Sequence, residues 1–189
     1  TASGSTFAGV PDDAGVLPFD FDGDGDVDLV MNSGSDLAVL ENDGSGGFTL
    51  ATTSIGDAGA SLAIGDREGD GDPDVLSGRP SPLSPAWLVN DGSPMTWATA
   101  PATARTDTFS QLALLDVNED GNVDILGYDP DDAEIIYLPT GGADVVFSGQ
   151  PYAGFGVLDA DLDGDVDVYI ANGSGGMPTP AQDELLTLD

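Results

Sequence analysis

Short apolar runs alternate along this chain with acidic, glycine-containing segments. Four times, one apolar run enters an acidic loop and a second one leaves it. The entering runs are residues 16–17 with Phe19, 62–64, 112–115 and 155–158, and the leaving runs are 29–31, 75–76, 125–126 and 168–170. Apolar runs of this length, bounded by turn-forming residues, predict β-strands. Each acidic loop is therefore expected to connect two neighbouring strands.

Two further strands are predicted after each of the first three loops. A third apolar run lies at residues 37–40, 87–89 and 135–138, and glycine-containing turns follow it. The fourth run carries one aromatic residue, which is Phe48, Trp97 or Phe147. Four short strands in about 45 residues are typical of one blade of a β-propeller.

The fourth repeat lacks a fourth strand with an aromatic residue. Residues 184–188 are predicted as its third strand, and the N-terminal Phe7 lies in phase with the other three aromatic positions. The N-terminal strand, residues 4–10, is therefore predicted to complete the last blade, which would remove an exposed sheet edge. It can do so within one chain or in a neighbouring chain, and the second arrangement leads to filaments. The alternative is that the four aromatic residues are unrelated members of the core.

The predicted fold is all-β, a small β-propeller of four four-stranded blades. The chain has 27 Gly and 13 Pro and little helical periodicity, which favours β structure. We expect a single repeat domain over residues 1–189. Its repeats are approximately 14–53, 60–101, 109–149, and 153–189 completed by 4–10.

The net charge of the chain limits the classes of molecule that it is expected to bind. The chain has 35 acidic residues, only 3 basic residues and a net charge of −32. Nucleic acid is excluded as a partner because its phosphates would be repelled. No apolar run is long enough to span a bilayer, so no membrane insertion is expected. Only 5 of the acidic residues are Glu. An excess of Asp favours turns or ligands for hard cations. The abundance of Asp and the absence of Lys also resemble the composition of halophilic proteins, and this alternative source of part of the charge stays open.

The four acidic loops align over nine residues without gaps. Oxygen-bearing side chains occupy positions 1, 3, 5 and 9, and glycine occupies position 6. The candidate ligands at positions 1, 3, 5, 7 and 9 are Asp20, Asp22, Asp24, Asp26 and Asp28; Asp66, Glu68, Asp70, Asp72 and Asp74; Asp116, Asn118, Asp120, Asn122 and Asp124; and Asp159, Asp161, Asp163, Asp165 and Asp167. Alternate side chains of a curled loop converge, the glycine permits a positive φ, and position 7 can offer its backbone carbonyl.

An all-oxygen ligand set predicts Ca²⁺, about four ions with one in each repeat. An EF-hand is excluded because its twelfth position needs a bidentate Glu, where these loops have Met31, Ser77, Gly127 and Ile170. The alternative is an Asp-Gly turn without an ion, in which three or four carboxylates would repel one another. The third loop is expected to bind most weakly because Asn118 removes one charge.

These loops resemble those of the FG-GAP/VCBS-like repeat family, which includes propellers of the integrin-α type. The resemblance rests on the DxDxDGxxD loops, on the DLVM, DVLS, DILG and DVYI segments, and on LAVLENDGSGGF after the first loop. It implies structural Ca²⁺ between the first two strands of each blade. The family usually closes with more than four blades, and Glu68 and Asn118 stand where Asp is usual at position 3.

The function expected from these features is that of a non-enzymatic extracellular or cell-surface module for adhesion, recognition or assembly, with a glycan or protein ligand. Millimolar calcium outside cells would fill even weak loops. A carbohydrate-binding lectin is one alternative, since Trp87, Trp97 and Tyr128 could stack on sugars. A polysaccharide-active enzyme is another, but the clustered acids are already assigned as ligands, and His, Lys and Cys are absent.

Overall fold

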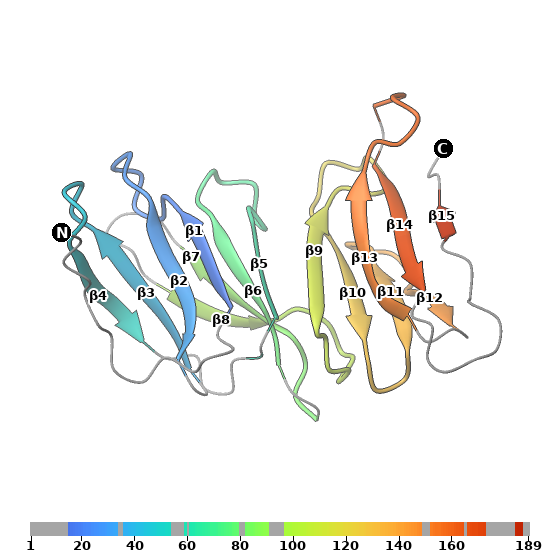
Figure 1. The fold of residues 1–189 in the computed structure, drawn as a ribbon. Coiled ribbons are helices and arrows are strands. Elements are labelled where there is room, and N and C mark those ends of the chain that lie inside the picture. Colours follow the sequence, from blue (N-terminus) through green and yellow to red (C-terminus); the bar gives the residue numbers. More distant parts are fainter. Residues whose placement is uncertain are drawn as a thin grey trace. The chain divides into compact units, whose positions relative to one another are not determined.

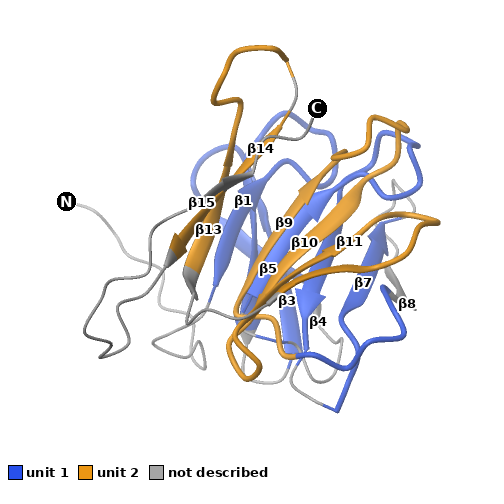
Figure 2. Ribbon diagram, turned by 90° about the vertical axis from the view of Figure 1, so that its right-hand side faces the viewer, with its two compact units in different colours: residues 1–107 blue, residues 108–189 orange. Residues whose placement is uncertain are grey.

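A computed structural model describes residues 15–33, 36–53, 59, 61–79, 82–90, 97–148, 152–164, 166–172 and 184–186. All regular elements in this part of the chain are β-strands, which confirms the all-β prediction. The strands belong to two compact units, residues 1–107 and 108–189 (Figure 2). Among the described residues, no helix is long and apolar enough to cross a membrane. The predicted N-terminal strand, residues 4–10, lies outside the described residues.

The first unit contains two antiparallel four-stranded sheets in which the strands follow one another in chain order (Figure 1). The first sheet consists of β1 (Val16–Phe19), β2 (Asp28–Ser33), β3 (Asp36–Asn42) and β4 (Phe48–Thr53). The second sheet consists of β5 (Ser61–Gly65), β6 (Asp74–Gly78), β7 (Ala86–Asn90) and β8 (Trp97–Pro101).

The second unit also contains two antiparallel sheets. The third sheet consists of β9 (Gln111–Leu115), β10 (Asp124–Asp129), β11 (Glu134–Leu138) and β12 (Val145–Ser148). The fourth sheet has three described strands, β13 (Tyr152–Leu158), β14 (Asp167–Asn172) and β15 (Glu184–Leu186). The predicted third strand of the last repeat is therefore present as β15. Four sheets coincide with the four predicted repeats, whereas closure into a propeller stays a prediction.

The acidic loops occupy the same place in all four sheets, between the first strand and the second. In each sheet the last residue of the first strand pairs with the position-9 Asp. These pairs are Phe19 with Asp28, Gly65 with Asp74, Leu115 with Asp124, and Leu158 with Asp167. Each loop therefore connects the same pair of opposed residues in its sheet. The nine-residue sequence repeat thus has the same strand register in all four sheets.

The second strands of the first three sheets carry buried apolar side chains on both faces. Val75 and Leu76 are neighbours on β6, and both side chains are fully buried. Successive residues of a strand point to opposite faces of the sheet, so both faces of the second sheet are covered. This explains why the sequence shows continuous apolar runs instead of a strict alternation of apolar and polar residues.

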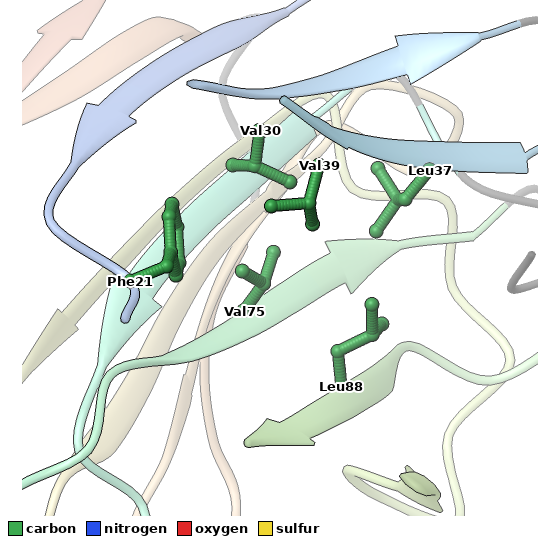
Figure 3. Packing of buried hydrophobic residues seen from close by; sticks show 6 residues of the cluster. All are labelled: Phe21, Val30, Leu37, Val39, Val75 and Leu88. Carbon is green, nitrogen blue, oxygen red and sulfur yellow. The ribbon is translucent and has the colours of Figure 1, made fainter. Parts of the chain in front are cut away.

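One apolar cluster joins the two sheets of the first unit. Figure 3 shows its six residues pointing toward one another. Phe21, Val30, Leu37 and Val39 come from the first loop and sheet, and Val75 and Leu88 come from the second sheet.

The second unit repeats this packing. Leu126 and Ile135 of the third sheet pack with Phe155, Val168 and Ile170 of the fourth. Counted from the first Asp of each loop, the residue at position 11 of one repeat packs in the same cluster as the residue at position 10 of the next. This holds for Val30 with Val75 and for Leu126 with Val168.

Candidate metal centres

The backbone of each acidic loop curls around the carboxylate at position 1. Asp20 accepts hydrogen bonds from the N–H groups of Gly23 (2.9 Å) and Gly25 (3.0 Å). In the second loop, Asp66 accepts from Gly69 (2.7 Å), Asp70 (3.1 Å) and Gly71 (2.9 Å). Several N–H donors converge on one carboxylate, which lies on the inside of the turn.

The third and fourth loops keep this arrangement. Asp116 accepts from the N–H groups of Asp120 (3.1 Å) and Gly121 (2.9 Å), and Asp159 accepts from Leu162 (2.7 Å). Each carboxylate oxygen has two lone pairs, so these bonds leave capacity for a cation. The position-1 Asp therefore organises the loop and still has oxygen lone pairs to offer.

Glycine at position 6 has a positive φ in every loop, as predicted. The φ values are 96° at Gly25, 95° at Gly71, 85° at Gly121 and 106° at Gly164. L-residues with a side chain rarely adopt this backbone conformation, so glycine is needed for the turn.

Position 4 also has a positive φ in every loop, which was not predicted from the sequence. The φ values are 73° at Gly23, 71° at Gly69, 55° at Glu119 and 65° at Leu162. Glycine at this position in the first two loops was the available signal. In the third and fourth loops a residue with a side chain is held in the left-handed region, which costs free energy.

The position-9 carboxylates are buried and tie the loop to itself. Asp28, Asp74 and Asp124 are fully buried, and Asp167 is 2% exposed. Each accepts the N–H of the residue at position 2 of its own loop. The donors are Phe21 (2.9 Å), Arg67 (2.7 Å), Val117 (3.2 Å) and Ala160 (2.7 Å).

In the first three repeats the position-9 carboxylate also accepts a hydrogen bond from a backbone N–H at the end of the third strand or two residues beyond it. The N–H groups of Asn42 (2.8 Å), Asn90 (2.8 Å) and Thr140 (2.7 Å) donate to Asp28, Asp74 and Asp124 respectively. The position-9 Asp is thus a structural link between the loop and the third strand as well as a candidate ligand. Only the ligand role was predicted from the sequence, although the recurrence of Asn42 and Asn90 was a signal for the second role.

In the first and fourth loops, the side chains at positions 1, 3 and 9 form carboxylate triads. One oxygen each from Asp20, Asp22 and Asp28 lies within 4.8 Å of the other two, and the same is true of Asp159, Asp161 and Asp167. Oxygen ligands 2.3–2.6 Å from a Ca²⁺ ion are at most about 5 Å apart. Both triads therefore fit calcium in donor type and in spacing.

The second loop differs because Glu68 replaces Asp at position 3. Its carboxylate pairs with Arg67 (Nη1 to Oε1, 3.2 Å), and the Arg67 guanidinium lies 5.9 Å from the centroid of the Trp87 ring. Within the described chain, Asp66, Glu68 and Asp74 do not form a group as tight as the two triads. The Arg67 guanidinium is thus already paired with Glu68, one of the predicted calcium ligands.

The third loop has an amide at position 3. Asn118 donates through Nδ2 to Asp120 (3.1 Å), and its Oδ1 accepts the Asp120 N–H (3.0 Å). The Tyr137 hydroxyl donates to Asp124 (2.9 Å). The side chains at positions 1, 3 and 9 of this loop therefore include two carboxylates in place of three.

The carboxylates at position 5 are exposed and take part in the local turn. Asp24, Asp70 and Asp120 accept the N–H groups of Asp26 (2.8 Å), Asp72 (3.0 Å) and Asn122 (2.9 Å), the residues at position 7. In the fourth loop the Asp163 N–H donates to Asp161 (3.3 Å), and Asp165 lies outside the described residues. A ligand role for positions 5 and 7 stays a prediction.

Gathering these carboxylates changes the pKa of the position-3 side chain in the first, second and fourth loops. Partial desolvation, followed by the charges of neighbouring carboxylates, raises the pKa of Asp22, Glu68 and Asp161 above the ordinary values. At position 5 of the third loop the direction is opposite, because hydrogen bonds from Asn122 lower the pKa of Asp120. A bound divalent cation would favour the charged form of the position-3 carboxylates.

A protein-family model described as FG-GAP-like repeat matches residues 20–77 and again residues 66–127. These two overlapping segments contain the first three acidic loops and more than half of the chain. No curated protein matches the chain.

Proposed function

Because the chain belongs to the FG-GAP-like repeat family, we propose that it is a calcium-stabilised, non-enzymatic repeat protein acting outside the cell or on its surface in adhesion, recognition or assembly. The observation that carries the proposal is the carboxylate triad at positions 1, 3 and 9 of the first and fourth loops. Calcium in these loops is a structural ion, and its chemistry is to neutralise and hold together charges that otherwise repel one another.

The residues of the loop determine what such an ion stabilises. Asp28 is hydrogen-bonded to Phe21 in its own loop and to Asn42 at the end of β3. An ion held by Asp20, Asp22 and Asp28 therefore connects the exposed turn to a buried carboxylate that is attached to two further points of the sheet. The ligand that is most exposed, Asp22, gains a partner for its charge.

The free energy of this stabilisation follows from mass action. A ligand that binds only the folded state stabilises it by about 2.7 kcal/mol when its free concentration is 100 times the Kd. Loops with exposed ligands are suited to millimolar calcium, which is found outside cells. The net charge of −32 also supports a calcium requirement, because several divalent ions would reduce self-repulsion.

No specific observation favours the lectin or the enzyme. Trp87 is 3% exposed and lies beneath Arg67, so it offers no open ring face to a sugar. The side chain of Trp97 lies outside the described residues. The clustered carboxylates of the acidic loops accept backbone hydrogen bonds and are proposed ligands of the ion. They therefore need no acid–base role to explain them, and the proposal stays non-enzymatic.

Isothermal titration and thermal unfolding of the full chain test the calcium proposal. We expect calcium uptake, a melting temperature that falls sharply in EDTA, and little rescue by magnesium. The variant Asp22→Asn should lower the calcium response, and Asp36→Asn, which removes the same charge outside the loops, is the matched control. Absence of calcium uptake by the intact protein would refute the proposal.

The assembly role has a separate test, since residues 4–10 are proposed to complete the last sheet. Sedimentation velocity in calcium should give either a compact monomer or a polymer, and deletion of residues 1–10 should destabilise the monomer or dissolve the polymer. If the deletion changes neither the size nor the melting temperature, the N-terminal strand has no such role.

A further inference from the structure

A continuous line of hydrogen bonds connects the first acidic loop with the second. It begins at Phe21, which occupies position 2 of the first loop. The Phe21 N–H donates to Asp28 (2.9 Å), and the Phe21 carbonyl accepts a hydrogen bond from Nδ2 of Asn90 (3.2 Å). Asn90 lies at the end of β7 in the second sheet, so the two backbone groups of Phe21 bind its own loop and the next repeat.

The line continues from Asn90 into the second loop. The Asn90 N–H donates to Asp74 (2.8 Å), and the other oxygen of Asp74 accepts the N–H of Arg67 (2.7 Å). Asp28, Asp74 and Asn90 are fully buried, and Phe21 is 2% exposed. Water has little access to these groups, and a satisfied network of buried hydrogen bonds holds its members in one geometry.

The equivalent residues of the first and third repeats bind within their own repeat. The side chain of Asn42 donates to the carbonyl of Val27 (3.0 Å), and the hydroxyl of Thr140 donates to the carbonyl of Val123 (2.8 Å). Asn90 shares the backbone bond to the position-9 Asp with these residues and adds a bond to the neighbouring loop, 69 residues away.

Packing supports the same connection. Phe21 belongs to the apolar cluster that includes Val30 of the first sheet and Val75 of the second (Figure 3). Val75 directly follows Asp74 in the chain. A shift of the first loop therefore disturbs both a hydrogen bond and a close-packed contact with the second repeat, and close-packed interiors transmit such shifts.

We propose that Asn90 couples calcium binding at the first loop to calcium binding at the second. The proposal rests on the proposed function, since it requires both loops to take calcium. An ion in the second loop fixes Asp74, Asp74 fixes Asn90, and Asn90 fixes Phe21 and with it Asp28. The first loop is then ordered before its own ion arrives, and linkage requires the same coupling in the reverse direction.

Nuclear magnetic resonance of the full chain can follow the two loops separately. Gly25 and Gly71 donate their N–H groups to the position-1 carboxylates, so their amide signals report calcium in the first and second loops. The double substitution Asp66→Asn with Glu68→Gln disables the second loop. We expect it to raise the calcium midpoint at Gly25 about fivefold, the lower end of typical couplings between sites.

The variant Asn90→Thr, which copies Thr140, tests the role of the Asn90 side chain. It leaves the net charge and the backbone bond to Asp74 unchanged and removes the amide that reaches Phe21. In this background, disabling the second loop should no longer move the Gly25 midpoint. Asn42→Thr is the matched control, because Asn42 binds its own loop, and it should leave the fivefold shift intact.

A second measurement avoids any change at Asn90. With the first loop disabled by Asp20→Asn and Asp22→Asn, calcium in the second loop should slow hydrogen exchange at the Phe21 N–H. An unchanged exchange rate, or a Gly25 shift that persists in Asn90→Thr, would overturn the coupling through Asn90. If neither glycine signal responds to calcium in the unmodified protein, it is the proposed function that fails.

Discussion

The side-chain amide of Gln111 forms two hydrogen bonds with the backbone of Phe155. Its Nε2 donates to the Phe155 carbonyl (2.6 Å), and its Oε1 accepts the Phe155 N–H (3.1 Å). The pair joins β9 of the third sheet to β13 of the fourth. It also requires glycine at the preceding residue, since a Cβ on Gly154 would lie 2.7 Å from the Gln111 Oε1 and the φ of Gly154 is 148°.

Gln111→Ala should therefore weaken the packing of the third sheet on the fourth. The substitution leaves two partly buried backbone groups without their partner, and we expect the free energy of unfolding to fall by about 1–3 kcal/mol. Urea denaturation in saturating calcium measures this loss. A loss below about 0.5 kcal/mol would contradict the role given to Gln111.

Gly127→Ala should destabilise the second unit by overpacking. A Cβ at Gly127 would lie 2.4 Å from a ring carbon of Phe109, which is 1% exposed. Overpacking of this kind costs about 1–3 kcal/mol. The control is Gly156→Ala, because Gly156 is exposed and has no atom within 4 Å of the added carbon. Equal stabilities of the two variants in urea denaturation would refute the prediction.

Leu162→Gly should stabilise the protein. Leu162 has a φ of 65° and is 85% exposed, so its side chain contributes little burial while its backbone is strained. Relief of the left-handed strain is worth about 1–2 kcal/mol, partly offset by about 0.5–1 kcal/mol for the greater freedom of glycine in the unfolded chain. Leu162→Ala keeps the strained backbone and should show no gain, which separates the backbone effect from the exposure of the side chain.

Asp28 and Asp22 should behave differently when calcium is removed. Asp28 is fully buried and binds two backbone N–H groups, so Asp28→Ala should cost about 1–3 kcal/mol even in EDTA. Asp22 is exposed and repelled by its neighbours, so Asp22→Ala should not destabilise the metal-free protein. Both variants should lose calcium at the first loop. Chemical denaturation with and without calcium distinguishes the two roles, and equal losses in EDTA would argue against them.

Arg67→Gln should increase the calcium affinity of the second loop. The exposed ion pair between Arg67 and Glu68 competes with calcium for a predicted ligand. Exposed pairs are worth about 0.2–1 kcal/mol, so an affinity increase of up to about fivefold is expected in the Gly71 titration. Arg79→Gln removes the same charge outside the loops and is the control. If both variants raise the affinity equally, the effect comes from net charge instead of from competition at Glu68.

The short-range features of this protein were predictable from its sequence. The loop positions, the flanking strands and the positive φ of glycines such as Gly25 were predicted, because each depends on residues only a few positions apart. Turn-forming residues and strand-length apolar runs act locally, and the nine-residue alignment repeats that local signal. The left-handed position 4 was missed because Glu119 and Leu162 obscure the signal that Gly23 and Gly69 provide.

The roles of position 9, Asn90 and Gln111 were decided only by the tertiary structure. Asp28 is buried because β2 pairs with β3 and brings Asn42 onto its carboxylate. Asn90 reaches Phe21, and Gln111 reaches Phe155, because one sheet packs on the next within each unit. The sequence alone thus determined which residues form the loops and which oxygens they offer. Strand pairing and sheet packing join residues that are far apart in the chain. They decided which carboxylates are buried and hydrogen-bonded to the sheet, and which loops are connected.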